Sequence, residues 1–352
     1  MHEFDYSKIA DPEFFKDGCI PAHSDHKAFI SWDEYETGET GLRSSLDGIW
    51  KFSYAENTEA AVPEFWKDSC DCRKWDDIRV PAHIQMEGYD APKYVNVQYP
   101  WDGHEEIDPG EIPSRFNPTA SYVKYFTVPE NMKGRRVFIS FQGVESGFAL
   151  WLNGRYVGYS EDSFTPSEWE LTELLRAGEN KLAVQNFKYT SGSWCEDQDF
   201  FRFSGIFRSV YLYSIPYTHI MDLRVKTRLD DSFESAKLEI TAEAVGRGRA
   251  VYALIRDGRQ VCTGEGTLNG TQTVSFMVKK PLLWSAEHPN LYELRVEVYD
   301  VDGNLEECIA QKTGFRKFEL RDGLMLLNGR RIVFKGVNRH EFNSRTGRVP
   351  SR

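Results

Sequence analysis

The stretch Phe148-Ala-Leu-Trp-Leu-Asn-Gly-Arg-Tyr-Val-Gly-Tyr159 carries the clearest fold signal in this chain. Two runs of apolar and aromatic residues stand on either side of Asn153-Gly154. An Asn-Gly pair favours the two-residue turn of a β-hairpin, because both turn residues must adopt positive φ angles. The stretch therefore predicts two antiparallel strands joined by a tight turn.

The same signal recurs along the chain. Asp257-Gly258, Asp302-Gly303 and Asn328-Gly329 each separate two runs that are rich in apolar residues. Arg136-Val-Phe-Ile-Ser-Phe-Gln142 alternates apolar and polar residues, which is the period of a half-buried strand. Many short strands with turn signals between them predict a mainly β protein built from sandwiches.

Helical periodicity is scarce in the sequence. Only residues 167–176 predict a short helix. Ser167 is its expected N-cap, Glu170 stands three residues on as in a capping box, and Ala177-Gly178 would end it.

Changes in sequence pattern suggest the domain boundaries. Residues 1–44 carry few strand signals and predict an extended N-terminal arm. A first all-β domain is expected at 45–216, where Pro216 interrupts the apolar run that ends it, and a second strand-rich domain follows at 217–318. Residues 319–352 predict a hairpin and then a more continuously apolar strand, which is typical of the buried parallel strands of a barrel.

The composition restricts the class of protein. Of the 352 residues, 40% are hydrophobic and 28% are charged, as in an ordinary folded domain, while aromatic residues reach 14%. The formal net charge of −11 disfavours binding to nucleic acid phosphates and to anionic lipid. The sequence has no apolar run of membrane-spanning length, and its first residues lack the features of a signal peptide. We therefore expect a cytoplasmic protein.

The six cysteines are scattered along the chain. Cys70 and Cys72 form the only close pair, and no second pair of ligands stands at zinc-site spacing. We expect reduced thiols here rather than a metal site.

Residues 196–208, Glu-Asp-Gln-Asp-Phe-Phe-Arg-Phe-Ser-Gly-Ile-Phe-Arg, interleave three carboxylates and two arginines with four phenylalanines. Aromatic rings cover the apolar face of a sugar, and carboxylates accept hydrogen bonds from its hydroxyls. The stretch is therefore typical of the rim of a sugar-binding pocket. A buried charge cluster, with Asp199 paired to Arg202 or Arg208, explains the same residues equally well, because structural ion-pair networks resemble functional sites.

Seven separate segments are similar, in the same order, to motifs of the β-galactosidase branch of the family 2 glycoside hydrolases. They are 85–100, 151–163, 175–184, 196–208, 283–292, 314–316 and 336–342. Gly336-Val-Asn-Arg-His-Glu-Phe342 resembles the segment that opens the catalytic barrel, and 196–208 resembles the segment that closes the first domain. The resemblance extends over nearly the whole chain from about Gly41 onward.

The resemblance implies a jelly-roll, galactose-binding-like domain at 45–216, an immunoglobulin-like sandwich at 217–318 and the first strand of a (β/α)8 barrel at 319–352. It also implies a retaining β-galactosidase that removes terminal non-reducing β-D-galactose, as from lactose, and that commonly forms homo-oligomers. Such enzymes use two carboxylates about 5 Å apart, one as acid/base and one as nucleophile. In the family both are glutamates on later barrel strands, beyond Arg352, so we expect no catalytic residue in this chain and no activity of the chain alone.

Three residues match family positions that contact the galactose. Asn96 matches the residue that hydrogen-bonds the galactosyl hydroxyls, Asp199 the carboxylate that contacts the sugar and binds a monovalent cation, and His340 a histidine at the mouth of the barrel. Without the resemblance, Asn96 suits a turn, Asp199 an ion pair and His340 a hydrogen-bonded core position. The cation is expected to be Na⁺, with its other ligands in the barrel, where a Mg²⁺ site is also expected.

Phe201 stands where tryptophan is commoner in the family. An aromatic platform for the substrate is kept, but the indole N–H donor is lost.

Two other classes of function stay open. A pair of β-domains without a barrel would suit a non-catalytic carbohydrate-binding module, since jelly rolls include lectins. β-Glucuronidases and β-mannosidases belong to the same family. The Asp197-Gln-Asp199 and Asn96-Val-Gln-Tyr-Pro100 blocks favour the galactosidase branch, and no added cluster of Arg or Lys for a glucuronide stands near them.

Overall fold

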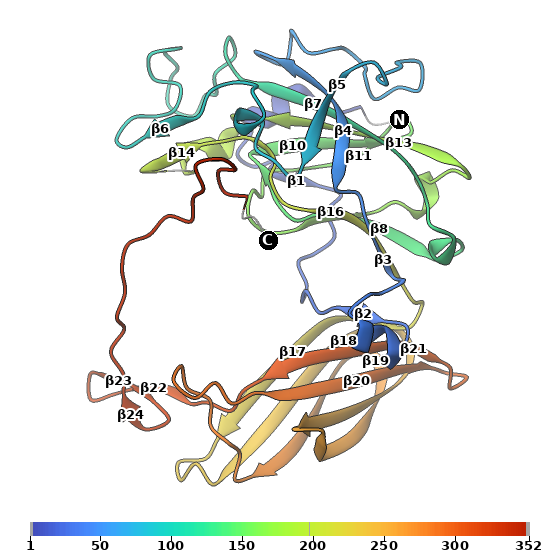
Figure 1. The fold of residues 1–352 in the computed structure, drawn as a ribbon, viewed down its shortest axis with the longest axis vertical. Coiled ribbons are helices and arrows are strands. Elements are labelled where there is room, and N and C mark those ends of the chain that lie inside the picture. The colour runs from blue at the N-terminus through green and yellow to red at the C-terminus, as the bar shows by residue number, and fades with distance from the viewer. Residues whose placement is uncertain (1–2, 197, 350–352) are drawn as a thin grey trace. The chain divides into compact units, whose positions relative to one another are not determined.

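Figure 1 shows the fold of this protein in a computed structural model, which describes residues 3–196 and 198–349. Contacts between Cα atoms divide the chain into two units. The first unit comprises residues 1–21, 43–214 and 340–352, and the second comprises 22–42 and 215–339. The N-terminal segment that was expected to be one extended arm is therefore shared between the two units.

The first unit contains two main sheets. One has seven strands in the order β1-β11-β10-β13-β7-β4-β5, and the other has four in the order β12-β8-β16-β3. Their bounds are β1 (Lys16–Asp17), β3 (Arg43–Ser45), β4 (Gly48–Ala55), β5 (Asp76–Val80), β7 (Thr119–Thr127), β8 (Arg136–Phe141), β10 (Gly147–Leu152), β11 (Arg155–Ser160), β12 (Ser167–Glu170), β13 (Glu179–Phe187) and β16 (Val210–Ile215). Two further pairs are β6 (Lys93–Val95) with β14 (Phe200–Arg202) and β9 (Val144–Glu145) with β15 (Gly205–Ile206). Short 3-10 helices lie at η1 (Tyr6–Ala10), η2 (Ile84–Met86), η3 (Glu130–Met132), η4 (Thr172–Leu174) and η5 (Ser191–Trp194).

Strand β10 shows why the seven-stranded sheet is covered on both faces. All of its residues are buried, and successive side chains in a strand point to opposite faces. Leu150 and Leu152 belong to the core that strands of both main sheets share. Ala149 and Trp151 belong to a second apolar cluster on the other face, which the N-terminal Phe4 helps to form.

The second unit is a sandwich built from one continuous set of strands. The order is β17-β18-β20-β21-β2, with β19 also paired to β18. Their bounds are β2 (Ala28–Phe29), β17 (His219–Leu229), β18 (Ser235–Arg256), β19 (Arg259–Lys279), β20 (Tyr292–Asp300) and β21 (Leu305–Thr313). The register of β18 against β19 shifts between Ala244 and Arg247, so β18 pairs with β17 before the shift and with β20 after it. Two layers then enclose an apolar core that includes Leu238, Leu254 and Leu294.

Smaller elements complete the second unit. Helix α1 (Trp32–Thr37) begins at Ser31, whose hydroxyl accepts the Glu34 N–H, and ends at Gly38 in the left-handed conformation. A three-stranded sheet consists of β22 (Phe318–Arg321), β23 (Leu324–Leu327) and β24 (Arg330–Arg331).

The tight turns predicted from the sequence are confirmed. Asn153-Gly154, Asp257-Gly258 and Asn328-Gly329 join β10 to β11, β18 to β19 and β23 to β24, and all six residues have positive φ. Asp302-Gly303 lies between β20 and β21, with Gly303 at a φ of 85°. These turns depend on local chemistry alone, which is why a sequence pattern can identify them.

The helix predicted at residues 167–176 is wrong. Residues Ser167–Glu170 form β12, which pairs with β8, and only Thr172–Leu174 form a helical turn. Trp169 is fully buried and contacts Phe141 and Phe148 edge to face. Burial of this indole against the opposite sheet outweighs the local capping signal.

The apolar strand predicted after the hairpin is also absent from the described structure. Residues 332–342 contain no regular secondary structure, and Val333, Phe334 and Val337 are exposed. A parallel barrel strand needs neighbours on both sides to pair its backbone groups, and none of the described strands pairs with residues 333–342. Separately, none of the helices in the described residues has the length and apolar character needed to cross a membrane.

Candidate functional site

A two-stranded ribbon of the first unit brings two predicted sugar-contacting residues together. Strands β6 and β14 are antiparallel, with Val95 opposite Phe200. Asn96 follows β6 and Asp199 precedes β14, so both lie at the same end of the ribbon. Both residues are exposed.

The third predicted residue lies at the same place. The imidazole of His340 stacks on the ring of Phe200 with centroids 4.5 Å apart and planes 18° apart. The segment that begins at His340 runs beside β14 in Figure 1. Phe200 is buried, so it forms a fixed base that relates Asn96, Asp199 and His340.

Further rings extend this surface. Phe342 stacks on Phe201 at 4.9 Å and lies 6.2 Å from the ring of Phe203. Tyr94 meets Phe201 edge to face at 5.2 Å. The aromatic platform expected of residues 196–208 is therefore formed by β14 together with rings from two other segments.

Asp199 has a specific partner. The Tyr94 hydroxyl donates to its Oδ1 atom at 2.6 Å and also lies 3.2 Å from its carbonyl oxygen. This hydrogen bond raises the pKa of Tyr94. Asp199 itself adopts a φ of 53°, in the left-handed region that aspartate tolerates better than most residues. The tyrosine therefore fixes the carboxylate at the tip of a tight turn.

The proposed ion pair between Asp199 and Arg202 or Arg208 is wrong for the described residues, because both arginines have other partners. Arg202 is fully buried and lies 3.0 Å from Glu196, and Arg208 donates to the carbonyl oxygens of Phe164 and Gln142. A buried charge cluster does exist in this stretch, but its acid is Glu196. Asp197, which belongs to the same motif, lies outside the described residues.

A second buried ion pair holds the loop that leads to Asn96. Lys188 Nζ lies 2.5 Å from Asp90 Oδ2, with both side chains nearly fully buried. Burial lowers the pKa of Lys188, while the charge of Asp90 opposes that change. Gln85 donates to the same carboxylate at 2.9 Å. The loop is thus tied to the residue that follows β13.

Arg348 ties the segment after His340 to the same surface. Its guanidinium lies 2.9 Å from the buried Glu145 carboxylate, donates to the Phe201 carbonyl at 3.1 Å, and lies 4.3 Å from the centre of the Phe200 ring. A buried cation with this many partners has little freedom to move. The aromatic stack between His340 and Phe200 therefore has a rigid support on each side.

The implied Na⁺ site fits Asp199 as a single ligand. An exposed carboxylate oxygen is the kind of donor that a hard cation prefers. Within residues 3–196 and 198–349, no group of three or more acidic, histidine or cysteine side chains could hold a metal ion. Among the described residues, Asp199 is therefore a candidate ligand for Na⁺, and no cluster of acidic, histidine or cysteine side chains is present for Mg²⁺.

Sequence reasoning missed Phe200, Tyr94 and Arg348 as supporting residues. Phe200 is next to the predicted Asp199 in the sequence, and Tyr94 is close to the predicted Asn96. Side chains alternate between the two faces of each short strand, so Phe200 is buried while Tyr94 is exposed. Arg348 stands far along the chain from Glu145, and no local pattern reveals that contact.

Models of known families match the chain in three consecutive parts. "Glycosyl hydrolases family 2, sugar binding domain" matches residues 43–216, "Glycosyl hydrolases family 2" matches 218–316, and "Glycosyl hydrolases family 2, TIM barrel domain" matches 318–352. Together these matches extend over most of the sequence.

Curated relatives agree with the family models. A β-galactosidase of Halalkalibacterium halodurans is 51% identical over 97% of this chain, and one of Streptococcus thermophilus is 48% identical over the same share. The chain spans 34% of the length of each of these two proteins. A β-galactosidase large subunit of Leuconostoc lactis is 39% identical, and the chain spans 57% of it.

Solved structures share the fold at lower identity. A β-glucuronidase of Bifidobacterium dentium, solved with coumarin-3-O-glucuronide, superposes with a TM-score of 0.70 at 19% identity over 89% of this chain and 55% of that one. Similarity at this level shows the arrangement of strands and no more. The family models and the curated relatives together show that this chain belongs to family 2 of the glycosyl hydrolases.

Proposed function

We propose that this chain is the N-terminal portion of a retaining β-galactosidase and forms one wall of its galactose site. The observation that carries the proposal is that Asn96 and Asp199 lie at the same end of the β6–β14 ribbon, where His340 stacks on the buried ring of Phe200. The identities of 51% and 48% to proteins named β-galactosidase support galactosides, such as lactose, as the substrate class.

Each residue has a chemical role in this proposal. The Asn96 amide both donates to and accepts from sugar hydroxyls. Asp199 accepts a hydroxyl proton and supplies one oxygen to a Na⁺ ion, which would neutralise its charge beside the sugar. His340 is held flat against Phe200, so its ring nitrogens point along the ring plane, where they can reach a hydroxyl.

The bond-breaking step needs a general acid and a nucleophile on opposite sides of the glycosidic bond. We assign both to glutamates of the barrel that follows in the longer relatives, and a Mg²⁺ site as well. This chain orients the sugar and excludes water from one side of it. Assembly into a homo-oligomer, or with a second subunit as the name of the Leuconostoc lactis relative suggests, belongs to the same proposal.

The test is a chimera. This chain replaces the matching third of the Halalkalibacterium halodurans enzyme, and hydrolysis of 4-nitrophenyl β-D-galactoside is compared with that of the matching β-D-glucuronide. We expect activity on the galactoside alone. Asn96→Ala, Asp199→Ala and His340→Ala should each lower kcat/KM at least about tenfold, or about 1.4 kcal/mol.

Two exposed residues of the second unit serve as matched controls. Asp302→Ala and His288→Ala remove the same chemical groups from surface turns and should leave kcat/KM unchanged. The proposal is wrong if the three site variants are as active as the controls, or if the chimera prefers the glucuronide.

A further inference from the structure

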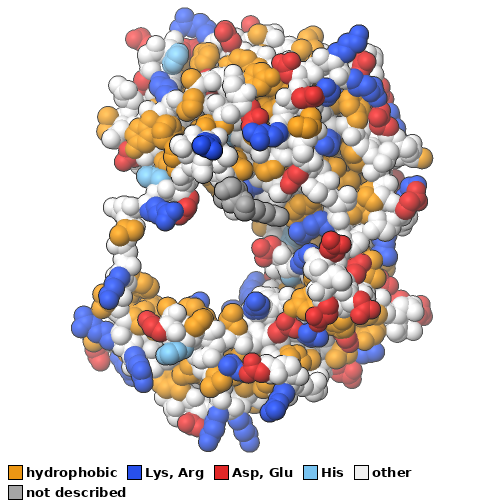
Figure 2. Space-filling model, viewed as in Figure 1, with side chains coloured by type: hydrophobic (Ala, Val, Ile, Leu, Met, Phe, Trp, Pro, Cys, Tyr) orange, Lys and Arg blue, Asp and Glu red, His pale blue; other side chains and the backbone are white. Residues whose placement is uncertain are grey.

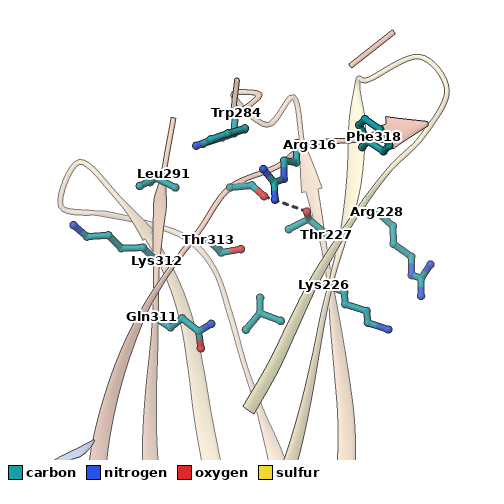
Figure 3. A pocket seen from close by; sticks show the side chains of 12 residues that line it. Lys226, Thr227, Arg228, Trp284, Leu291, Gln311, Lys312, Thr313, Arg316 and Phe318 are labelled. Atoms are coloured by element: carbon teal, nitrogen blue, oxygen red, sulfur yellow. Dashed lines mark hydrogen bonds between the residues drawn. The ribbon is translucent and has the colours of Figure 1, made fainter. Parts of the chain in front are cut away.

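Charged side chains give little indication of a second ligand site. Acidic and basic side chains are intermixed on the face of the molecule that Figure 2 shows. In the second unit, a groove between β17 and β21 has a volume of about 630 Å³. Figure 3 shows the side chains of Lys226, Arg228 and Lys312 pointing away from that groove. A more specific feature is a pair of thiols in the first unit.

The two thiols are close to each other. Cys70 and Cys72 lie in the loop between β4 and β5, with their Sγ atoms 3.8 Å apart, and both are reduced. A disulfide needs a separation of about 2.0 Å, which is within reach of rotation about the Cα–Cβ bonds. The Cys72 thiol also lies 3.6 Å from the carbonyl oxygens of Phe65 and Cys70. A thiol is a weak donor, so little is lost when these contacts are given up.

The seven-stranded sheet holds the main chain of both cysteines. Lys181 of β13 donates from its Nζ atom to the Cys70 carbonyl at 2.6 Å. The hydroxyl of Tyr125, on β7, accepts the Cys72 N–H at 3.3 Å. Two reactive groups whose main chains are fixed near each other react together more readily than either reacts with a group in solution.

Lys181 also supplies a positive charge beside the thiols. It is buried, and its ammonium group donates to the carbonyl oxygens of Phe65 and Lys67 at 2.7 Å each. Carbonyl oxygens are neutral acceptors, so they leave the charge uncancelled. Burial raises the pKa of Cys72 to about 11, and the charge of Lys181 opposes that change. The lysine therefore favours the thiolate, which is the reactive form in disulfide exchange.

The two thiols differ in their access to solvent. Cys72 is fully buried in the second apolar cluster of the first unit. Cys70 is partly exposed, and Asp71 between them is exposed. A small oxidant therefore reaches Cys70 first, and Cys72 is placed to attack the product from inside.

We propose that Cys70 and Cys72 form a reversible disulfide by exchange with a low-molecular-weight disulfide such as oxidised glutathione. The Cys70 thiolate attacks one glutathione sulfur, the glutathione disulfide bond breaks, and one glutathione thiolate leaves. The Cys72 thiolate then attacks the Cys70 sulfur and displaces the second glutathione. The two protein thiols are oxidised, one glutathione disulfide is reduced, and the two departing thiolates take up the two protons. This modification site is separate from the galactoside hydrolysis proposed above.

Mass spectrometry of the 352-residue chain tests the exchange. The reduced chain is incubated with excess oxidised glutathione, alkylated as it is unfolded, and cleaved with trypsin. Cleavage after Lys67 and Arg73 leaves both thiols in one peptide, 68–73. We expect this peptide to be lighter by two hydrogen atoms and to carry neither glutathione nor an alkyl group. The exposed Cys195 serves as a control and should keep a bound glutathione.

Excess reduced glutathione should then restore both thiols of peptide 68–73, because a disulfide formed by exchange is open to the reverse reaction. A peptide that stays fully alkylated after the oxidising step, or that retains glutathione, would contradict the proposal. So would a disulfide that excess reduced glutathione leaves intact.

Single substitutions separate the two steps. Cys72→Ala removes the second thiol and should trap glutathione on Cys70. Cys70→Ala removes the first, and Cys72 should then be modified at least about tenfold more slowly than in the parent chain. The proposal is wrong if Cys72 of the Cys70→Ala variant reacts as fast as in the parent, or if the Cys72→Ala variant keeps no glutathione on Cys70.

Discussion

The two units differ in how they bury ionisable side chains. In the first unit, the buried cations Arg202 and Lys188 are each paired with an acid. Arg202 lies 3.0 Å from Glu196, and Lys188 lies 2.5 Å from Asp90. Both pairs hold segments that lead to the predicted sugar-contacting residues.

In the second unit, two ionisable side chains are instead neutral at neutral pH. Glu307 is fully buried and accepts the Ile220 N–H at 2.7 Å, and burial raises its pKa to about 8. His26 is partly buried, and burial lowers its pKa to about 4. At neutral pH the acid is therefore mainly protonated and the imidazole is uncharged.

Charged pairs and neutral groups have different consequences when they are buried. A buried ion pair stabilises little in net terms but fixes geometry, because neither partner can leave the other without a large penalty. A neutral buried acid such as Glu307 accepts a backbone N–H and needs no cation beside it. The buried pairs of the first unit thus fix the segments that lead to the predicted sugar-contacting residues.

Removal of one partner of a charged pair should give the largest effect. Arg202→Met leaves the Glu196 carboxylate without this buried cation and should lower the free energy of unfolding by about 3–5 kcal/mol. Urea denaturation of the chain measures the change. Arg136→Met removes an arginine from a pair with Glu170 that is largely exposed and should cost far less. Similar losses for both variants would remove the proposed contrast between buried and exposed pairs.

The local part of the fold was predictable from sequence because local chemistry determines it. The turn at Asn153-Gly154 needs only two residues that tolerate positive φ. The mistaken helix at 167–176 shows the limit of that reasoning, since Trp169 packs in a strand against Phe141 of the paired strand β8 and Phe148 of the opposite sheet. The strand with which a segment pairs, and the residues that bury it, are distant in the sequence. A capping signal depends only on neighbouring residues and cannot reveal them.

The three candidate site residues come from the family resemblance, and their sugar-binding roles stay predictions. Asn96 and Asp199 lie at the same end of the β6–β14 ribbon, and His340 stacks on Phe200 of that ribbon. The residues that hold this surface, such as Arg348 on Glu145, come from segments about two hundred positions apart. Such contacts follow from the three-dimensional fold and leave no trace in spacing.

Glu307→Gln should have the next largest effect, and it depends on pH. Folding raises the pKa of Glu307 from 4.5 to about 8. Its contribution to stability is therefore fully present below pH 4.5 and is lost as the pH rises toward 8. Glutamine keeps an acceptor for the Ile220 N–H and cannot ionise. Relative to the parent chain, the variant should gain about 2–4 kcal/mol between pH 5 and pH 8 in urea denaturation. Parallel pH profiles would show that the acid is not neutral in the folded chain.

His26→Gln should change the stability of the second unit at acidic pH, by a smaller amount. Folding lowers the pKa of His26 from 6.5 to about 4, through burial and the nearby His23 and His219, while Asp222 opposes the shift. Its contribution is present above pH 6.5 and is lost as the pH falls toward 4. The variant should be less acid-sensitive by about 1–3 kcal/mol over that window. His288→Gln, at an exposed position, should leave the acid profile unchanged.

Tyr94→Phe should have the smallest effect on stability. It is also the sharpest test of the first unit as a binding surface. The hydroxyl that this change removes donates to Asp199 at 2.6 Å, and the tyrosine is 49% exposed, so solvent can replace the lost bond. The denaturation midpoint should therefore scarcely move. In the chimera, however, the carboxylate at the tip of the turn loses its orientation, and kcat/KM for the galactoside should fall about tenfold. Tyr217→Phe removes a hydroxyl that is 81% exposed in the second unit and should change neither quantity. A Tyr94→Phe chimera with unchanged kinetics would mean that Asp199 needs no positioning by its neighbour, and the rigidity argued for this surface would then depend on the buried ion pairs alone.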